Sequence, residues 1–475
     1  MARYLSLGIC AFLAGALGSS VAVEPLSADS QRWQRPVDRF SVTNRPRAVP
    51  EALSDNIEVL AVLPPLPDGS PGDVWGVGDL AVLAERARGW SLVDVTDPRM
   101  PFRRSSTGGL FTQDVKAAGT LLAATNEAPE VGAGVALYDI SDPAAPVELS
   151  RIGSGLATSV HNVFLDGGFL YASSNSTGRV EIFDVRTPTI PVHVASVEKT
   201  GGRIHDAVVV DGRLYSSFLG GGFTVHDVSN PAVPRELVSH DYPDAFTHSA
   251  WPSAGGRFLF TTDEVPGGHM RVFDLVTPDG GGPVRQVGRF IASQPAIIHN
   301  VHTRGDLVFA SYYTAGMRVI DVSTPRLPVE VGFIDTFPGA SQTFQGAWGV
   351  YPYDPAGRIF ISDQQTGLWI VRFDGRIAAA PTGIEVRAAL ERTALFARAV
   401  FDLTWDAHPL AVGYNIYRAE PGGPFTRIND EEPHTSTRFL ESLEGAGSQE
   451  YAVSAVLADG TESRPSRIVL AEASR

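Results

Sequence analysis

The sequence predicts an all-β protein in which a seven-bladed β-propeller is followed by a β-sandwich. The main observation is a repeat in which a short apolar run ends in Asp and Pro follows four residues later. The repeated aspartates are spaced by 43 to 47 residues: Asp94, Asp139, Asp184, Asp227, Asp274 and Asp321. A less regular seventh copy, Leu368–Arg372, follows them. A period of about 45 residues with β-branched and aromatic runs is typical of propellers, in which each repeat forms one four-stranded blade.

Residues 1–22 have the pattern of a secretory signal peptide. Arg3 precedes an apolar stretch from Leu5 to Leu17, and small residues follow at Ser20 and Ala22. The stretch is too short to span a bilayer, so we expect cleavage after Ala22 and no membrane span in the mature chain. Residues 23–56 are rich in Pro, Arg, Ser and Asp without periodicity, which predicts an extended N-terminal segment.

The composition excludes several classes of function. The single cysteine, Cys10, lies in the leader, so the mature chain has no disulfide, Cys nucleophile or thiolate metal site. The formal net charge is -15 at pH 7, without basic blocks. Such a chain is a poor binder of nucleic acid or anionic membranes, whereas acidity favours solubility and cation binding. An exported β protein without disulfides suggests a bacterial source, with a secreted, extracellular or periplasmic location.

Each repeat is expected to form four antiparallel strands, and the third repeat shows them best. Gly167 and Gly168 supply the positive φ angles that its first hairpin needs. Asp184 can accept backbone N–H bonds in the corner before the outer strand. The expected strands of this repeat are His161–Leu165, Phe169–Ser173, Arg179–Val185 and Val192–Val197.

The propeller is expected to cover residues 57–376. Its last repeat has only three strands before the chain leaves at Gly375, and the strand Ile57–Leu63 precedes the first repeat without a partner. We expect Ile57–Leu63 to supply the outer strand of the seventh blade. This closes the ring and removes an exposed sheet edge.

Residues 381–475 depart from the repeat. Trp405 lies in an alternating strand, Gly413–Arg418 forms another, and Tyr451–Val456 precedes a turn. A core Trp on an early strand and a Tyr that starts the penultimate strand resemble the fibronectin type III sandwich. This resemblance implies a spacer or adhesive module rather than a catalytic one.

Four consecutive repeats carry histidine in one slot, at the opening of the first strand. They are His161, His205, His248 and His299, in a chain with 11 histidines. First strands line the central channel of a propeller, so these imidazoles are expected to form an arc at one mouth. Imidazoles with acidic and phenolic neighbours suit a borderline divalent metal. The candidate metals are Zn, Fe, Cu and Ca.

Further candidates share this slot or lie opposite it on the second strand. The second strand runs antiparallel to the first, so its end lies opposite the start of the first strand. This places His248 near Asp263 and Glu264, and His299 near Tyr312. In the seventh repeat we align Ala347–Trp348 with the slot. The expected ligand-binding rim is Asp114, Asn162, Asp206, Asp263, Glu264, Asn300, Tyr312, Trp348 and Asp363.

Two interpretations of the histidines stay open. In the first, each ring is a repeated architectural device that bonds a carbonyl of the neighbouring blade. In the second, two to four of the rings bind a metal or an anionic ligand. A catalytic version is a metal-dependent hydrolase or oxidoreductase, in which the metal lowers the pKa of a bound water and Glu264 or Asp363 acts as base.

Third strands such as Met317–Ser323 resemble LVIVD repeats. The order of the first-strand motifs resembles the choice-of-anchor B proteins over residues 57–374: His161-Asn162, His205-Asp206, Phe246–Trp251, His299-Asn300 and Gly346–Tyr353. The resemblance implies an exported, mostly bacterial propeller with no generally assigned reaction. We therefore predict a non-enzymatic binding, adhesion or scaffold protein. Its partner is expected to be an extracellular protein, a glycan or a small ligand.

Overall fold

The computed structural model describes residues 56–128, 134–153, 157–276, 282–292, 296–337, 339, 344–392, 397–445 and 447–473. The predicted signal peptide and the N-terminal segment before residue 56 lie outside these ranges. Within them, no helix has the length and apolar character needed to cross a membrane.

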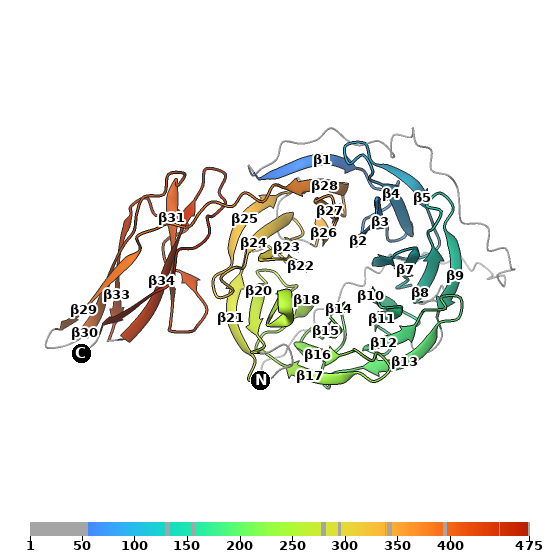
Figure 1. Cartoon of the computed structure of the whole chain (residues 1–475), viewed down its shortest axis with the longest axis horizontal. Coiled ribbons are helices and arrows are strands. Elements are labelled where there is room, and N and C mark those ends of the chain that lie inside the picture. The colour runs from blue at the N-terminus through green and yellow to red at the C-terminus, as the bar shows by residue number, and fades with distance from the viewer. Residues whose placement is uncertain are drawn as a thin grey trace, which may run out of the picture. The chain divides into compact units, whose positions relative to one another are not determined.

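Four-stranded antiparallel sheets follow one another around a ring (Figure 1). Sheet one contains β2 (Val74–Val77), β3 (Leu80–Ala84), β4 (Trp90–Asp94) and β5 (Phe102–Ser106). Sheet two contains β6 (Val115–Ala118), β7 (Leu121–Thr125), β8 (Val135–Asp139) and β9 (Val147–Ile152). Sheet three contains β10 (Val160–Asp166), β11 (Phe169–Ser174), β12 (Arg179–Asp184) and β13 (Val192–Val197). Sheet four contains β14 (Asp206–Val210), β15 (Arg213–Ser217), β16 (Phe223–Asp227) and β17 (Arg235–His240).

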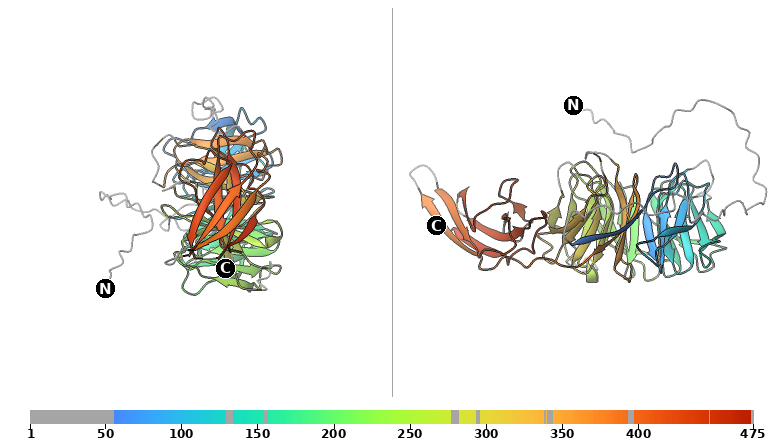
Figure 2. Two further views of the ribbon diagram at one scale, coloured as in Figure 1. Left: turned by 90° about the vertical axis from the view of Figure 1, so that its left-hand side faces the viewer. Right: turned by 90° about the horizontal axis from the view of Figure 1, so that it is seen from above.

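The remaining sheets of the ring continue this pattern. Sheet five contains β18 (Thr247–Pro252), β19 (Phe258–Asp263), β20 (Met270–Asp274) and β21 (Arg285–Phe290). Sheet six contains β22 (Val301–Arg304), β23 (Leu307–Ser311), β24 (Met317–Asp321) and β25 (Val329–Ile334). Sheet seven contains β26 (Ala347–Tyr351), β27 (Arg358–Asp363), β28 (Gly367–Phe373) and β1 (Ile57–Leu63). The first strands of the sheets face the centre of the ring (Figure 1), and side views show strands running along the ring axis (Figure 2).

Sheet seven joins the two ends of the repeat region. β1 pairs antiparallel with β28, from Ile57 opposite Phe373 to Leu63 opposite Leu368. Six of the seven residues of β1 have apolar side chains that are buried on both faces of the strand, including Val62, which is 2% exposed. The pairing of β1 with β28 confirms the predicted closure by Ile57–Leu63. It leaves β28 without a free edge.

The repeated aspartate ends the third strand in the predicted way. In six sheets its Oδ1 accepts the backbone N–H of the residue two positions later, at 2.8 to 3.0 Å. The acceptor stabilises a turn where the ladder stops, and the outer strand starts after this turn. The corner bonds are made by Asp94, Asp139, Asp184, Asp227, Asp274 and Asp321.

The C-terminal region forms two further sheets with a shared apolar core. One sheet has the order β29 (Glu385–Arg392), β30 (Ala397–Thr404), β33 (Arg438–Glu444). The other has the order β32 (Thr426–Arg427), β31 (Gly413–Ala419), β34 (Gly447–Val456), β35 (Val469–Ala473). Trp405, Tyr414 and Tyr451 are buried in the core between them. The alternating pattern of apolar and polar residues around Trp405 thus reflects a sheet with one buried face.

Candidate metal centre

A β-bulge occurs at the histidine slot of sheets three and five and at the matching position of sheet seven. In sheet three, Val160 pairs with Ser174 and Asn162 with Ser173, so His161 is the extra residue. Consecutive residues of a regular strand point to opposite faces, whereas a bulge re-aims one of them. Both members of a pair such as His161-Asn162 therefore line the same small cavity on the channel.

The register of sheet seven corrects our alignment of the last repeat. Ala347 pairs with Asp363 and Gly349 with Ser362, so Trp348 is the bulged residue and matches His161. The slot pair in this sheet is consequently Trp348-Gly349 rather than Ala347-Trp348. Sequence comparison of the repeats missed this shift because a bulge has no fixed residue type.

Hydroxyl groups on the second strand bond to the backbone at the histidine slots. Thr262 Oγ1 accepts the N–H of Ser249 at 3.1 Å and donates to the carbonyl of His299 in the next sheet at 2.6 Å. Ser311 likewise accepts from Asn300 N–H at 3.1 Å and donates to the carbonyl of Trp348 at 2.7 Å. Each hydroxyl thus accepts a hydrogen bond from a backbone N–H of its own sheet and donates one to a carbonyl of the next sheet.

Two tiers of residues line the cavity. We call Gln113, His161, His205, His248, His299 and Trp348 the histidine tier, and Asp73, Asp114, Asn162, Asp206 and Asn300 the acidic tier. The space between them is ≈ 10 Å³ for the centre of a water-sized sphere. This is about the room that one water molecule or ion needs.

The four histidines form the predicted arc. Ring centroids lie 4.3 Å apart for His161 and His205, 4.3 Å for His205 and His248, and 4.0 Å for His248 and His299. Trp348 continues the arc, 4.4 Å from His299. Two overlapping sets of three residues have ligand atoms within 4.8 Å of one another: His161, His205 and His248, and His248, Glu264 and His299.

Two of the rings are oriented by hydrogen bonds from one nitrogen. His161 Nδ1 contacts Glu127, whose carboxylate also accepts from Asn175 Nδ2 at 3.2 Å. His299 Nδ1 contacts the carbonyl of Trp348 in the next sheet at 2.6 Å. The architectural interpretation therefore holds for one nitrogen of His299. It leaves the other nitrogen unexplained.

Several imidazole nitrogens are buried without a hydrogen-bond partner among the described residues. They are His205 Nε2, His299 Nε2 and both nitrogens of His248. The nearest anionic group is Glu264, whose oxygens lie 3.6 Å from His248 Nε2 and 3.8 Å from His299 Nε2, beyond hydrogen-bond distance. Buried polar atoms are normally satisfied, so these nitrogens point to a missing partner.

Burial keeps most of the histidine tier neutral. It lowers the pKa of His205, His248 and His299 well below the usual value, and the neighbouring imidazoles lower it further. Burial also raises the pKa of Glu264 to about 7, even though Tyr313 donates a hydrogen bond to it. For His161, burial opposes protonation, but the adjacent Glu127 carboxylate outweighs it and raises the pKa to about 9. Neutral imidazole is the form that binds metals.

The acidic tier is built around Lys116. Its Nζ lies 2.7 Å from Asp73 Oδ2 and also contacts Asp114. Asp206 Oδ1 and Asp73 Oδ1 are buried without a hydrogen-bond partner in the described chain. Burial raises the pKa of Asp73 and of Asp206 to about 6. The tier thus places excess negative charge beside the histidines.

Aromatic side chains cluster next to the acidic tier. They stand two residues further along the first strands, on the same face as the acidic residues. His302 lies 4.4 Å from Trp251 and 6.4 Å from Trp75, and Phe164 lies 5.8 Å from Trp75. These rings thus contact one another beside the acidic tier.

Three predicted rim residues lie elsewhere, which corrects the expectation for each. Asp263 binds Tyr242 Oη at 2.8 Å and Arg271, and Asp363 binds Thr336 Oγ1 at 2.7 Å and two backbone N–H groups. Both carboxylates bind residues outside the histidine slot: Tyr242 follows β17 of sheet four, and Thr336 follows β25 of sheet six. The bulge moves the slot residue away from its direct cross-strand partner. Tyr312 is fully buried and packs edge-on against Phe290 at 6.3 Å.

Tyr313, Asp73 and Lys116 are site residues that sequence reasoning missed. Tyr313 takes the place expected for Tyr312, because its φ of 34° turns the chain after β23 and brings its ring 5.0 Å from His299. Lys116 follows Asp114 by two residues, and this strand periodicity could have placed both on the channel face. The remaining predicted residues, Asp114, Asn162, Asp206, Glu264, Asn300 and Trp348, lie in or beside the tiers.

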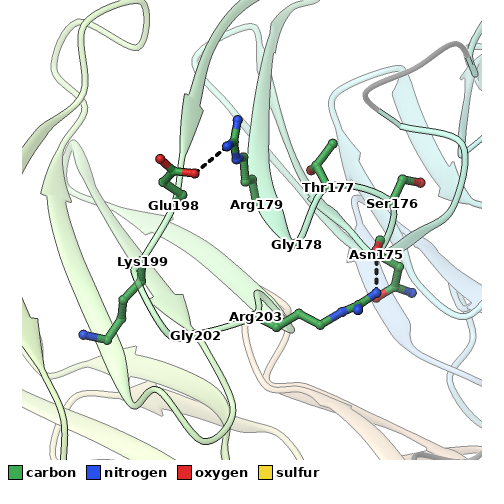
Figure 3. Close-up of a pocket in the computed structure, with 9 residues that line it drawn as sticks. All are labelled: Asn175, Ser176, Thr177, Gly178, Arg179, Glu198, Lys199, Gly202 and Arg203. Carbon is green, nitrogen blue, oxygen red and sulfur yellow. Dashed lines mark hydrogen bonds and ion pairs between the residues drawn. The ribbon is translucent and has the colours of Figure 1, made fainter.

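A second, larger hollow of ≈ 330 Å³ is lined by the turn before β12 and by the connection from β13 to β14 (Figure 3). Arg179 pairs with Glu198 at 2.6 Å, and Arg203 donates to the carbonyl of Asn175 at 2.5 Å. Lys199 is paired with Asp241 at 2.7 Å. The cations of this hollow are therefore already partnered, and its link to the histidine tier is the bond from Asn175 to Glu127.

Comparison with known proteins supports the fold. The LVIVD repeat model matches residues 201–241, a stretch that contains the whole of sheet four. No curated protein matches the chain. The solved WD40 repeats of RRP9 are 10% identical over 68% of this chain and 99% of theirs, with a TM-score of 0.51. A structure of U3-55K gives 10% identity over 68% of this chain and 100% of its own, also with a TM-score of 0.51. The chain is thus a β-propeller that contains an LVIVD repeat.

Proposed function

We propose that this protein is an exported binding scaffold that holds a divalent transition metal in its histidine tier. The observation that carries the proposal is the set of buried imidazole nitrogens without a partner at His205, His248 and His299. In this proposal the seven sheets of the ring are the blades of a seven-bladed propeller. The C-terminal pair of sheets is a fibronectin type III-like module, and the partner is an extracellular protein, a glycan or a small ligand.

The surroundings of the rings support metal binding. A metal-bound histidine usually donates its other N–H to a carboxylate or a carbonyl. His161 has Glu127 in this role, and His299 has the carbonyl of Trp348. The architectural interpretation accounts for these anchoring bonds but leaves Nε2 of His299 buried and unsatisfied. Donors of this kind favour zinc, copper or iron over calcium, which prefers oxygen ligands.

Metal analysis of untagged full-length protein tests the proposal. We expect zinc or copper to remain bound after desalting and to raise the melting temperature of chelator-treated protein. His205→Ala and His299→Ala should lose both effects. His193→Ala is the matched control, because His193 lies on the outer strand β13 and bonds Glu181 at 2.9 Å. Absence of retained metal, with melting temperatures unaffected by added zinc, copper or iron, would falsify the proposal.

A metal-dependent hydrolase is the second candidate function. The pKa and the position of Glu264 favour it. Its pKa of about 7 suits a group that exchanges protons at neutral pH, and it adjoins both His248 and His299. A bound divalent ion would supply Lewis acidity, and Glu264 would take a proton from water. Zinc-dependent cleavage of activated esters or phosphate esters that disappears in Glu264→Gln, with zinc retained, would establish this activity.

A further inference from the structure

We propose that Tyr313 is a positioning residue that holds the carboxylate of Glu264 at the metal ion of the histidine tier. This role rests on the proposed metal binding and adds two elements to it. The first is a carboxylate ligand, Glu264, which binds the ion together with His248 and His299. The second is the hydrogen bond from Tyr313 that orients this carboxylate. Tyr313 does not touch the ion and acts through Glu264.

Glu264 lies where a ligand of the ion would lie. Its Oε2 is 3.6 Å from His248 Nε2, and its Oε1 is 3.8 Å from His299 Nε2. Zinc bonds to nitrogen or carboxylate oxygen are about 2.0 to 2.2 Å long, so such ligand atoms of one ion are at most about 4.3 Å apart. Both separations fit this limit but are too long for a hydrogen bond. The three residues accordingly form one set of candidate ligands.

The Glu264 carboxylate is held by a hydrogen bond, as metal-binding side chains usually are. Tyr313 Oη donates to Oε1 of Glu264, whose side chain is 14% exposed. The terminal torsion of a glutamate has no sharp preference, so this bond decides which way the two oxygens point. It fixes Oε1 and leaves Oε2 facing His248.

Tyr313 is itself fixed by the backbone. Its φ of 34° lies in the left-handed region, which a tyrosine adopts only where the surrounding structure holds it. The Tyr313 carbonyl accepts the N–H of Gly316 at 3.0 Å and the N–H of Ala347 in sheet seven at 2.9 Å. The side chain is 1% exposed, and its ring lies 5.0 Å from His299. A rigid support thus presents the phenol to Glu264.

The same turn occurs in two other sheets with a different side chain at this position. Arg86 in sheet one and Leu219 in sheet four both have a φ of 47°. Each pairs with a residue that precedes or begins the first strand of the following sheet, as Tyr313 does. The turn therefore does not need a tyrosine. Of these three turns, the one beside Glu264 carries the phenol.

A second tyrosine–carboxylate bond lies next to this one and provides the control. Tyr242 Oη donates to Oδ1 of Asp263 at 2.8 Å, and Tyr242 is 9% exposed. Asp263 precedes Glu264 in the chain but belongs to neither set of candidate ligands among the described residues. Loss of either phenol hydroxyl removes a hydrogen bond to a carboxylate, whereas only Tyr313 bonds a proposed ligand.

The zinc affinity of the full-length, untagged protein tests this role. The protein is stripped of metal with a chelator and titrated with Zn²⁺ against a competing indicator. We expect Tyr313→Phe to weaken zinc binding about 10- to 100-fold, the usual effect of losing a residue that orients a ligand. Tyr242→Phe should bind zinc like the wild type. Melting temperatures of the metal-free variants show whether both are folded.

A double variant tests whether Tyr313 acts through Glu264. Glu264→Gln should also weaken zinc binding, and adding Tyr313→Phe to it should cause no further loss, because both changes act on the same ligand. The visible absorption of the Co²⁺ form is a second readout, since it depends on the ligand set. It should change in Tyr313→Phe and stay constant in Tyr242→Phe.

Wild-type zinc affinity in Tyr313→Phe, or additive losses in the double variant, would overturn the role of Tyr313. If Tyr313→Phe does not fold, wild-type affinity in Glu264→Asp, which draws the carboxylate back, would overturn it equally. Unchanged affinity in Glu264→Gln, with zinc lost in His299→Ala, would overturn it while sparing the proposed function, and would favour the hydrolase in which Glu264 is a base. Failure of the wild type to bind zinc, copper or cobalt would overturn both proposals.

Discussion

Nε2 of His248 lies 3.6 Å from Oε2 of Glu264, and neither side chain has the charge state of an ordinary ion pair. In an ion pair the carboxylate raises the pKa of the imidazole, and the imidazolium lowers the pKa of the carboxyl group. Here burial moves both the other way, lowering the pKa of His248 and raising that of Glu264 to about 7. The two groups do not stabilise each other as charges. This arrangement agrees with the proposal that a metal ion binds beside His248 and Glu264.

Closure of the ring by β1 should be essential for stability. Val62 is buried opposite Trp369, so Val62→Asp places an uncompensated carboxylate in the core of sheet seven. We expect the free energy of unfolding to fall by more than about 3 kcal/mol in urea titrations. Glu58→Ala on the same strand removes only exposed pairs with Arg99 and Arg372, and should cost less than about 1 kcal/mol. Equal urea midpoints for Val62→Asp and the wild type would show that β1 is dispensable.

The corner aspartates should contribute through one turn bond each. Asp94→Ala removes the acceptor of the Thr96 N–H, and we expect a loss of about 1 kcal/mol in the free energy of unfolding. Asp94→Asn should keep most of this stability, because Asn230 accepts a comparable N–H bond from Ala232 at 3.3 Å. Chemical denaturation of both variants measures the difference. If Asn proves as costly as Ala, the ion pair with Arg104 is the important interaction instead.

Gly349 should be required beside the acidic tier. A Cβ at this position would lie 2.2 Å from Asp73 Oδ1 and 3.0 Å from Ser362 Oγ. Asp73 is held by Lys116 and cannot move without breaking that pair, so Gly349→Ala should lose about 1 to 3 kcal/mol of stability. In Gly220→Ala the nearest atom is 4.0 Å away, and we expect a change within about 0.5 kcal/mol. The melting temperatures of Gly349→Ala and Gly220→Ala measure this difference. Equal melting temperatures would show that Gly349 is not required.

His302 should make the protein sensitive to acid. Burial lowers its pKa to about 3, whereas the unfolded chain has the usual value of 6.5. The unfolded state therefore binds more protons between these values, and stability is lost as the pH falls below 6.5. Between pH 7 and pH 5 we expect His302→Phe to lose about 2 kcal/mol less than the wild type, since one pKa unit corresponds to about 1.4 kcal/mol. Unfolding curves at the two pH values measure this. A parallel loss in both proteins would exclude His302 as the source.

The fold was largely predictable because its signals are local and repeated. The corner aspartates mark the ends of third strands by a bond that spans only two residues. The strand Ile57–Leu63 has no partner in the first repeat, and the last repeat lacks one strand. Counting strands was therefore enough to predict that the two pair. The histidine arc was predictable for the same reason, since equal positions in successive repeats become neighbours in a ring.

The details of the site were not predictable, because they depend on bulges and turns. The bulge at Trp348 shifts the last repeat by one residue, and the positive φ of Tyr313 exchanges it with Tyr312. Asp263 is withdrawn by its bonds to Tyr242 and Arg271, from segments that the hairpin pattern does not include. Side-chain competition of this kind requires coordinates.

The pairing of β1 with β28 also has a consequence in time. β1 emerges early from the ribosome, yet its partner is made only at the end of the repeat region. At usual rates of synthesis this leaves an apolar strand waiting for roughly 15 to 60 seconds. Until then the nascent chain has unpaired strand edges at β1 and at the growing repeat region, and these edges can pair with other molecules. A chaperone that shields β1 during this interval should therefore raise the yield of native protein more than it raises the final stability.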